Sequence, residues 1–227
     1  MPSAIEHLAS DSHHQLKMEV KDVLVDNKIT EYLDKAAAGT AVPGGGSVAA
    51  LNAALAAGLT EMVANLTVGK KGYAAVEEEM QALAAMARQL RNKLTKAIDR
   101  DADAYTEVMA AYKLPKKTAD EIALRNQKIQ YAIKHAALVP LEVARGALAV
   151  IELADTAIRK GNKNAASDGA VAAMNARTAA LAAIYNVKIN LGSLDDERFV
   201  EELGREVTEL QNRVVKKENE ALSNVDI

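Results

Sequence analysis

The chain has 227 residues and a formal net charge of −3, and 49% of its residues are hydrophobic. This length suits one domain, and the mildly acidic balance argues against a nucleic-acid-binding surface. The absence of cysteine excludes disulfides, thiolate catalysis and cysteine-ligated metal sites. Only 3% of the residues are aromatic and much of the apolar content is alanine, so we expect closely packed helices.

The N-terminal part differs in composition from the rest of the chain. Residues 1–27 are predicted to be an extension, and 28–227 to form the main helical domain. Residues 1–21 are polar and lack the apolar run of a signal peptide, which predicts a cytoplasmic protein. A short amphipathic helix is predicted next, over 29–38.

Three consecutive glycines stand directly before a long run of helix-forming residues. The segment Ala41–Ser47 leads into a helix predicted over 47–66, with Ser47 as its N-cap. Glycine loses more backbone entropy on folding than other residues, so such a run indicates a geometric use. One use is a helix N-terminus that binds an anion or a polar edge of a ligand. The other is a tight loop that lets two helices pack closely, and both stay open. The spacing fits neither a Rossmann fingerprint nor a P-loop.

The helix predicted over 47–66 is about as long as a membrane span. It contains Asn52, Glu61 and Asn65, and its apolar residues are mostly alanine rather than leucine. This composition favours a helix buried in protein, and we expect no membrane partner.

Four further helices are predicted downstream, which gives an all-α bundle of about six mostly long antiparallel helices. The first contains neither proline nor glycine, so it should reach roughly 60 Å, and Leu114–Pro115 ends it. Thr118–Glu121 forms a capping box for the second, which Pro140 should kink. The four helices are placed at about 73–112, 118–158, 165–186 and 196–222.

A carboxylate interrupts the apolar stripe of the helix predicted over 73–112. The stripe passes through Ile98, Asp101, Tyr105 and Val108, so Asp101 should face the core. A buried carboxylate destabilises the fold unless it is paired or used. It could bond to the end or an arginine of a neighbouring helix, or serve as a partly desolvated general acid or base.

A second polar cluster precedes the helix predicted over 165–186. Asn164, Ser167 and Asp168 are all N-cap residue types, but one cap would suffice, so capping and ligand binding both stay open. The pair Lys70-Lys71 is either a solvated loop tip or an anion site. His135 has no second ligand three or four residues away, so we predict no metal site there.

Four segments are more specific together than each is alone. They are Val42–Ser47; Asn65–Tyr73; Asp101–Tyr105 with Leu114–Lys116; and Gly161–Asp168 continuing to Asn186–Asn190. In this order and spacing they resemble the cyclodeaminase/cyclohydrolase family of folate enzymes, over about residues 28–220. That family includes the cyclodeaminase half of formiminotransferase-cyclodeaminase and stand-alone bacterial methenyltetrahydrofolate cyclohydrolases. One departure is that family members usually read Ser-Asp-Ala-Gly, where this chain has Ser167-Asp168-Gly169-Ala170.

The resemblance implies an all-helical homodimer or larger homo-oligomer with a tetrahydrofolate derivative as substrate, and no bound metal or cofactor. We assign Asp101 as the general acid or base, and Asp168 as the electrostatic partner of the cationic folate or the residue that orients the pterin. The other matching positions would bind the substrate, and the two lysines would attract its anionic glutamate tail. They are Gly44, Gly45, Gly46, Ser47, Asn65, Lys70, Lys71, Tyr105, Asn164, Ser167 and Asn190.

Two reactions fit this resemblance, and the sequence does not choose between them. A cyclodeaminase closes 5-formiminotetrahydrofolate with loss of ammonia, whereas a cyclohydrolase adds water to the 5,10-methenyl bridge and opens it. Both pass through a tetrahedral carbon between N5 and N10. The alternative of another class is a non-catalytic helical scaffold or a folate-binding protein of the same fold.

Overall fold

The computed structural model describes residues 23–226. The extension predicted at 1–27 therefore lies outside the described residues except for its last five. Those five contain a short 3₁₀ helix, η1 (Leu24–Asp26), in which Leu24 is buried. The backbone N–H of Leu24 donates a 2.6 Å hydrogen bond to Asp99, so this segment packs onto the bundle.

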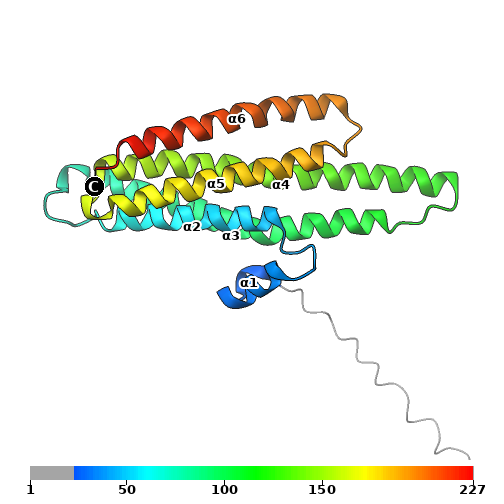
Figure 1. Ribbon diagram of the computed structural model, residues 1–227, viewed down its shortest axis with the longest axis horizontal. Coiled ribbons are helices and arrows are strands. Elements are labelled where there is room, and N and C mark those ends of the chain that lie inside the picture. Colours follow the sequence, from blue (N-terminus) through cyan, green and yellow to red (C-terminus); the bar gives the residue numbers. More distant parts are fainter. Residues whose placement is uncertain (1–22, 227) are drawn as a thin grey trace, which may run out of the picture.

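The described part of the chain contains six α-helices and no strand, which confirms the predicted all-α class (Figure 1). The predicted order is also confirmed, and two boundaries differ by more than two residues. The long third helix starts at Glu77, after a 3₁₀ turn at Ala74–Val76, and the fifth extends to Leu191. The helices are α1 (Ile29–Ala37), α2 (Gly45–Asn65), α3 (Glu77–Tyr112), α4 (Ala119–Lys160), α5 (Ala166–Leu191) and α6 (Glu197–Ser223).

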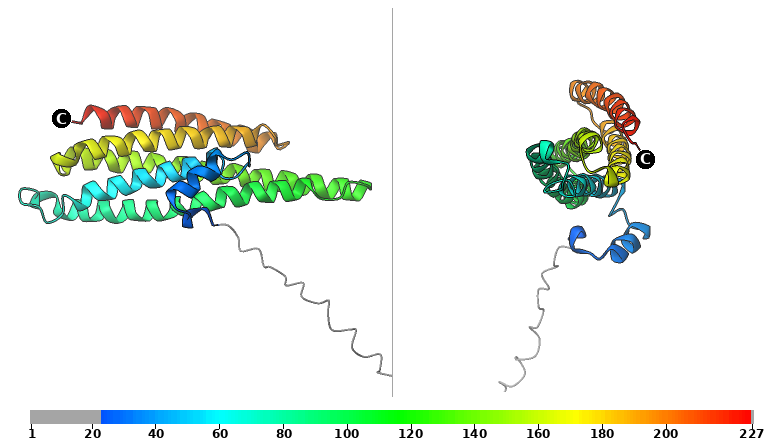
Figure 2. Two further views of the ribbon diagram at one scale, coloured as in Figure 1. Left: turned by 60° about the horizontal axis from the view of Figure 1, so that its bottom comes forward. Right: turned by 90° about the vertical axis from the view of Figure 1, so that its left-hand side faces the viewer.

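Four of these helices form the bundle. Helix α2 packs against α3 and α5, and α4 packs against the same two helices. Helix α6 lies across α4 and α5, on the far side of the bundle from α1, as the end-on view of Figure 2 shows. The fold therefore has a four-helix core with one covering helix, and α1 beside it.

Small residues allow these helices to approach closely. Many alanines of α2 and α5 have no exposed surface, among them Ala53, Ala57, Ala176 and Ala180. At the crossing of α4 and α5, a Cβ added to Gly169 would lie 2.6 Å from Cγ1 of Ile158. Real Cβ atoms do not approach other atoms so closely, so this crossing requires glycine.

The start of α4 has the predicted capping box. The backbone N–H of Glu121 donates to Oγ1 of Thr118 over 3.2 Å, and the Glu121 carboxylate accepts from the Thr118 N–H over 3.1 Å. Helix α4 continues through Pro140 to Lys160 without a break. The kink expected at Pro140 stays a prediction.

Helix α2 is the one described helix that is long and apolar enough to cross a membrane by length and composition. However, 61% of its most apolar window is buried inside the bundle, against the neighbouring helices. Its place between α3 and α5 is that of a core helix.

The glycine at the α4–α5 crossing gives a direct test of packing. Gly169→Ala should lower the free energy of unfolding by about 1–3 kcal/mol, because the added methyl group overpacks against Ile158. The matched control is Gly204→Ala on α6, where an added Cβ meets nothing within 4 Å. That variant should gain up to about 1 kcal/mol from higher helix propensity. Urea unfolding measures both, and equal effects would contradict the close crossing.

Candidate functional site

Asp101 of α3 lies at the N-terminus of α2. The Ser47 hydroxyl is within 3.2 Å of Oδ2 of Asp101 and 2.9 Å of the Ile98 carbonyl oxygen, so it can donate to either acceptor. The Ser47 backbone N–H also donates to the Asp101 carboxylate. Helix α2 is thus capped by a carboxylate from another helix.

The predicted N-cap role of Ser47 is therefore wrong. Gly44 occupies the N-cap position and supplies no side-chain hydrogen bond, while Ser47 lies inside the first turn and is fully buried. Asp101 accepts the hydrogen bond that an N-cap side chain would ordinarily accept. This confirms one explanation offered above for Asp101, namely that its carboxylate bonds to the end of a neighbouring helix.

The three glycines differ in what they do. A Cβ added to Gly46 would overlap the Asp101 carboxylate, so only glycine permits this contact. A Cβ on Gly45 would lie 3.4 Å from Nδ2 of Asn186, and one on Gly44 would lie 3.1 Å from the carbonyl oxygen of Ala41. Gly46 is therefore the glycine on which the position of Asp101 depends.

Burial changes the acidity of Asp101. The side chain is half-buried, and its removal from water raises the pKa of the carboxyl above the ordinary value of 3.8. The two hydrogen bonds from Ser47 oppose this shift, because they favour the ionised form. Asp101 consequently holds a proton more readily than an exposed aspartate does.

A pocket of about 400 Å³ opens beside Asp101. It is lined by the start of α2 and by residues of α3 and α4, which extend past that start (Figure 1). Its floor is formed by Gly44, Gly45 and Gly46. Its walls come from α3, α4, α5 and the loop before α2, and include Val42, Ala104, Tyr105, Val108, Tyr112, Ile133, Ala136, Asn186, Ile189 and Asn190.

Two amide side chains of α5 line this pocket. Nδ2 of Asn190 donates to the carbonyl oxygens of Ala136 and Asn186, over 3.1 and 2.9 Å. Nδ2 of Asn186 donates to the Ala182 carbonyl oxygen over 2.9 Å. Asn190 is among the predicted site residues, but Asn186 is not. Their spacing of four residues on an alanine-rich helix is the signal that could have found Asn186.

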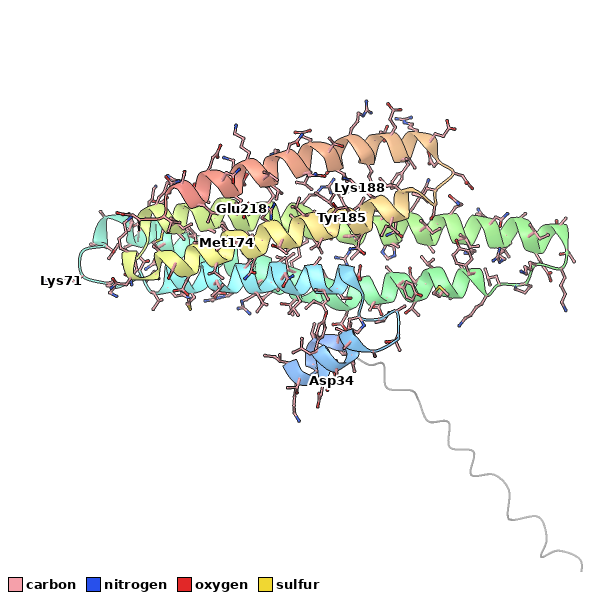
Figure 3. All side chains as sticks on the ribbon, in the orientation of Figure 1. Asp34, Lys71, Met174, Tyr185, Lys188 and Glu218 are labelled. Atoms are coloured by element: carbon pink, nitrogen blue, oxygen red, sulfur yellow. The ribbon has the colours of Figure 1, made fainter. Side chains whose placement is uncertain are left out.

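The remaining predicted residues gather at the opposite end of the bundle. There the loop after α2 contacts the turn between α4 and α5 through two hydrogen bonds from Asn162. Its Nδ2 donates to the Leu66 carbonyl oxygen, and its backbone N–H donates to Oγ1 of Thr67. Figure 3 shows Lys71 at this tip. The residues at this end are Asn65, Lys70, Lys71, Asn164, Ser167 and Asp168.

The structure does not bring the two groups together within one chain. Asp168 and Asn186 lie on the same helix, and their separation along it is about 27 Å at the standard helical rise. Asp101, Tyr105, Asn190, the glycines and Ser47 therefore form one group, and Asp168 with the two lysines belongs to another. The assigned roles of both groups stay predictions.

A second, larger pocket of about 560 Å³ lies between α1 and the α2–α3 side of the bundle. Its lining is mostly apolar, with Arg91 and Tyr32 among its few polar residues. It contains no carboxylate and none of the predicted site residues. The pocket at Asp101 is therefore the better candidate for acid–base chemistry.

Comparison with known proteins assigns the chain to a family. Residues 28–209, which include both groups of predicted site residues, match the family model for formiminotransferase-cyclodeaminase. The chain belongs to this family. The resemblance inferred from the four sequence segments is thus confirmed.

Individual relatives within the family carry two different names. The chain is 42% identical over 179 residues to the methenyltetrahydrofolate cyclohydrolase of Methylorubrum extorquens, covering 79% of this chain and 86% of that protein. It is 32% identical to the formimidoyltransferase-cyclodeaminase of Rattus norvegicus, covering 91% of this chain but 37% of the rat protein. The chain therefore spans little more than a third of the rat protein.

A solved structure shows the same fold. The crystal structure of formiminotetrahydrofolate cyclodeaminase from Thermotoga maritima superposes with a TM-score of 0.79 and 32% sequence identity. The match covers 88% of this chain and 96% of that one. The helical bundle is thus the fold of this family member as well.

The raised pKa of Asp101 predicts how stability depends on pH. A carboxyl with a raised folded-state pKa favours the native state below its unfolded pKa and loses this contribution as pH rises through the folded pKa. Asp101→Asn should therefore be more stable than the parent chain at pH 7. The difference in the free energy of unfolding between the variant and the parent should shrink on acidification. It should vanish below about pH 3.8, where the carboxyl is protonated in both the folded and the unfolded state.

Urea unfolding at a series of pH values, at one protein concentration, measures this difference. The control is Asp196→Asn, because hydrogen bonds to Lys134 and Phe199 lower the pKa of Asp196. That variant should instead be less stable than the parent at neutral pH. A difference for Asp101→Asn that does not change with pH would contradict the assigned shift.

Proposed function

We propose that this protein acts on the one-carbon bridge of tetrahydrofolate, and that it hydrolyses 5,10-methenyltetrahydrofolate to 10-formyltetrahydrofolate. The observation that carries the proposal is the half-buried Asp101 carboxyl beside a pocket, held by the first turn of α2. The named activity of the 42% identical Methylorubrum relative supports hydrolysis as the first choice.

The reaction needs a group that moves protons at one carbon. Water attacks the bridge carbon, which is flanked by N5 and N10, and passes one proton to the Asp101 carboxylate. The hydroxyl proton of the tetrahedral carbon then leaves as the C=O bond forms and the bond to N5 breaks. N5 takes up one of the two protons, and the other goes to solvent. A carboxyl with a raised pKa suits both the uptake and the return of a proton.

The same carboxyl also stabilises charge. As water attacks the cationic bridge, positive charge develops on the water oxygen, and an ionised Asp101 beside it stabilises that charge. Tyr105 and Tyr112 line the pocket and offer flat apolar surfaces for a ring system. The pocket volume lies within the range of about 300–1,000 Å³ that is common for small-molecule sites.

Cyclodeamination is the second candidate, and the named activity of the Thermotoga relative favours it. In that reaction N10 attacks the formimino carbon and the bond from this carbon to the departing nitrogen breaks. Asp101 would then donate a proton to the departing ammonia. Both candidates involve the same carbon, so they share the site described above.

Other features of the proposal depend on the family resemblance. They are a homo-oligomer of two or more copies, a cytoplasmic location and catalysis without a resident metal or cofactor. These three features stay predictions.

Absorbance at the methenyl band distinguishes the two reactions. Purified protein mixed with 5,10-methenyltetrahydrofolate should speed the loss of the band above the rate in buffer. With 5-formiminotetrahydrofolate, growth of the band with release of ammonia would show cyclodeamination instead. If neither folate changes the absorbance, and circular dichroism shows that the protein is folded, the result would contradict the proposal and favour a non-catalytic scaffold.

Removal of the Asp101 carboxyl tests its role as acid or base. Asp101→Asn should lower kcat by roughly 10²–10⁴-fold with a much smaller change in KM, because an amide cannot exchange the proton. The control is Asp99→Asn on the same helix, whose carboxylate binds the Leu24 N–H and does not line the pocket. Near-normal turnover by Asp101→Asn would show that another group moves the proton.

Gly46 should act as a positioning residue. Gly46→Ala would push the Asp101 carboxylate out of place, so kcat should fall at least tenfold, and the pH dependence of kcat should shift with the new surroundings of Asp101. Gly58→Ala, on the same helix, is the control because its Cβ would make an ordinary 3.5 Å contact with Arg91. Equal activity of the two variants would show that the position of Asp101 does not depend on Gly46.

A further inference from the structure

Helix α1 is held on the bundle mainly by one side chain. It lies beside the bundle, next to α2 and α3 (Figure 1). Tyr32 is the buried residue of this helix, whereas Ile29 and Leu33 are 80% and 60% exposed. Just before α1, the Leu24 N–H is bonded to Asp99 of α3, which fixes the preceding turn. The attachment of α1 itself therefore depends largely on the ring of Tyr32.

The hydroxyl group of Tyr32 is buried without a hydrogen-bond partner. The side chain is 8% exposed, and among the described residues no donor or acceptor bonds to its oxygen. A buried hydroxyl without a partner destabilises a fold, because it has lost its hydrogen bonds to water. A phenylalanine ring would attach α1 to the bundle without this cost. Packing alone therefore does not explain the hydroxyl.

Tyr32 packs on the turn of α3 that carries Asp101. It belongs to one apolar cluster with Leu24 and Ile98, and Ile98 is three residues before Asp101. The Ile98 carbonyl oxygen lies 2.9 Å from the Ser47 hydroxyl, which also reaches Asp101. Tyr32 lines the pocket beside α1, whereas Asp101 lines the pocket at the three glycines. The two side chains thus face different pockets from the same turn of α3.

The charge of Asp101 acts on the Tyr32 hydroxyl. Burial raises the pKa of Tyr32 above its ordinary value of 10.0, and the nearby charges of Asp101 and Asp99 raise it further. These negative charges oppose loss of the tyrosine proton, so the hydroxyl keeps a proton that it can donate. Of the two carboxylates, that of Asp99 is already bonded to the Leu24 N–H. Asp101 is therefore the better acceptor for Tyr32.

Asp101 can accept more hydrogen bonds than it receives. The two oxygens of a carboxylate offer about four acceptor sites. Within the described part of the chain, the hydrogen bonds to this carboxylate come from the hydroxyl and the backbone N–H of Ser47. Burial meanwhile works against its ionised form. A half-buried carboxylate that lacks donors thus lies near a buried hydroxyl that lacks an acceptor.

Other groups around Asp101 do little to favour its ionised form. It is the one charged side chain in the lining of its pocket, and α4 contributes only apolar side chains there. Its charged neighbours on α3 include Arg100, which is paired with Glu142 of α4. The ionisable or polar groups nearest to it are Ser47 of α2, Asp99, Arg100, Asp103, Tyr105 and Tyr112 of α3, Asn186 and Asn190 of α5, and Tyr32 of α1.

We propose that Tyr32 is a positioning residue for Asp101, whose ionised carboxylate accepts a hydrogen bond from the Tyr32 hydroxyl. The structure shows the two groups as neighbours that are not bonded. A full charge on Asp101 strengthens the attraction, because hydrogen bonds to ionised acceptors are shorter and stronger than those to neutral ones. Helix α1, which the ring alone anchors, can shift to close the distance. The role in catalysis rests on the proposed function, whereas the hydrogen bond does not.

Carbon-13 NMR of the aspartate carboxyl groups tests the hydrogen bond without any folate. In protein labelled at aspartate Cγ, the signal of Asp101 is the one that disappears in Asp101→Asn. With Tyr32→Phe, the midpoint of its titration should move up by roughly one pH unit, because the ionised carboxylate loses a donor. The matched control is Tyr131→Phe, since Tyr131 is 73% exposed on α4 and lies outside the pocket. That variant should leave the titration of Asp101 unchanged.

Two results of this titration would overturn the proposal. An unchanged midpoint for Asp101 in Tyr32→Phe would mean that the hydroxyl does not act on this carboxyl. A shift confined to the signal of Asp99 would mean that the hydroxyl donates to the other carboxylate. Tyr32→Phe removes one oxygen atom and keeps the buried ring, so the fold should persist, and circular dichroism checks this.

The pH dependence of kcat extends the test to catalysis. Asp101 must be ionised to accept a proton from water, so Tyr32→Phe should move the acidic limb of the profile to higher pH by the same amount. KM and the plateau of kcat should change much less. Loss of kcat at every pH, with the limb in place, would show a merely structural role and overturn the proposal. If the parent protein has no folate activity, the proposed function fails, and the NMR titration still decides the hydrogen bond.

Discussion

The contact between Asp101 and the first turn of α2 is the constraint on which the rest of the site depends. A carboxylate on the apolar side of α3 would destabilise the bundle if it stood alone, because burial opposes its charge. The Ser47 hydroxyl and backbone N–H satisfy it, and the missing side chain of Gly46 lets it approach. Helix α2 begins at this level of the bundle, and its first residues line the pocket together with Asp101.

This arrangement joins stability and chemistry in one group. Asp101 caps a helix, and yet burial keeps its pKa above the ordinary value. A carboxylate that only capped a helix would be expected to have a lowered pKa. The balance between burial and hydrogen bonding thus leaves a residue that can both hold α2 and exchange a proton.

Much of the fold could be predicted from the sequence, because the long α3 contains neither proline nor glycine and a capping box at Thr118 starts α4. The position of Asp101 on the apolar stripe of α3 was also visible. The cap of α2 was not, since its acceptor comes from residue 101, far along the chain from Ser47. Local capping rules assign Ser47 because they consider only neighbouring residues.

The arrangement of the site was harder to predict for a related reason. Motif order places Asp101, Asp168 and Lys70 in one set, but order along the chain does not say how far apart they lie in space. A helix as long as α5 separates its two ends by roughly 40 Å, so residues at opposite ends of α5 cannot share a pocket in one chain. Asn186 belongs to one of the four recognised segments but was not assigned to the site, because alanine on every side of α5 hides which face it occupies.

The place of α2 between α3 and α5 has a consequence for synthesis of the chain. Helix α2 is apolar on nearly all sides, and one of its main bundle neighbours, α5, begins a hundred residues after α2 ends. A growing chain must therefore carry one side of α2 uncovered until almost the whole domain has left the ribosome. Chains that end before α5 would keep that side exposed, and exposed apolar surface of this kind promotes aggregation.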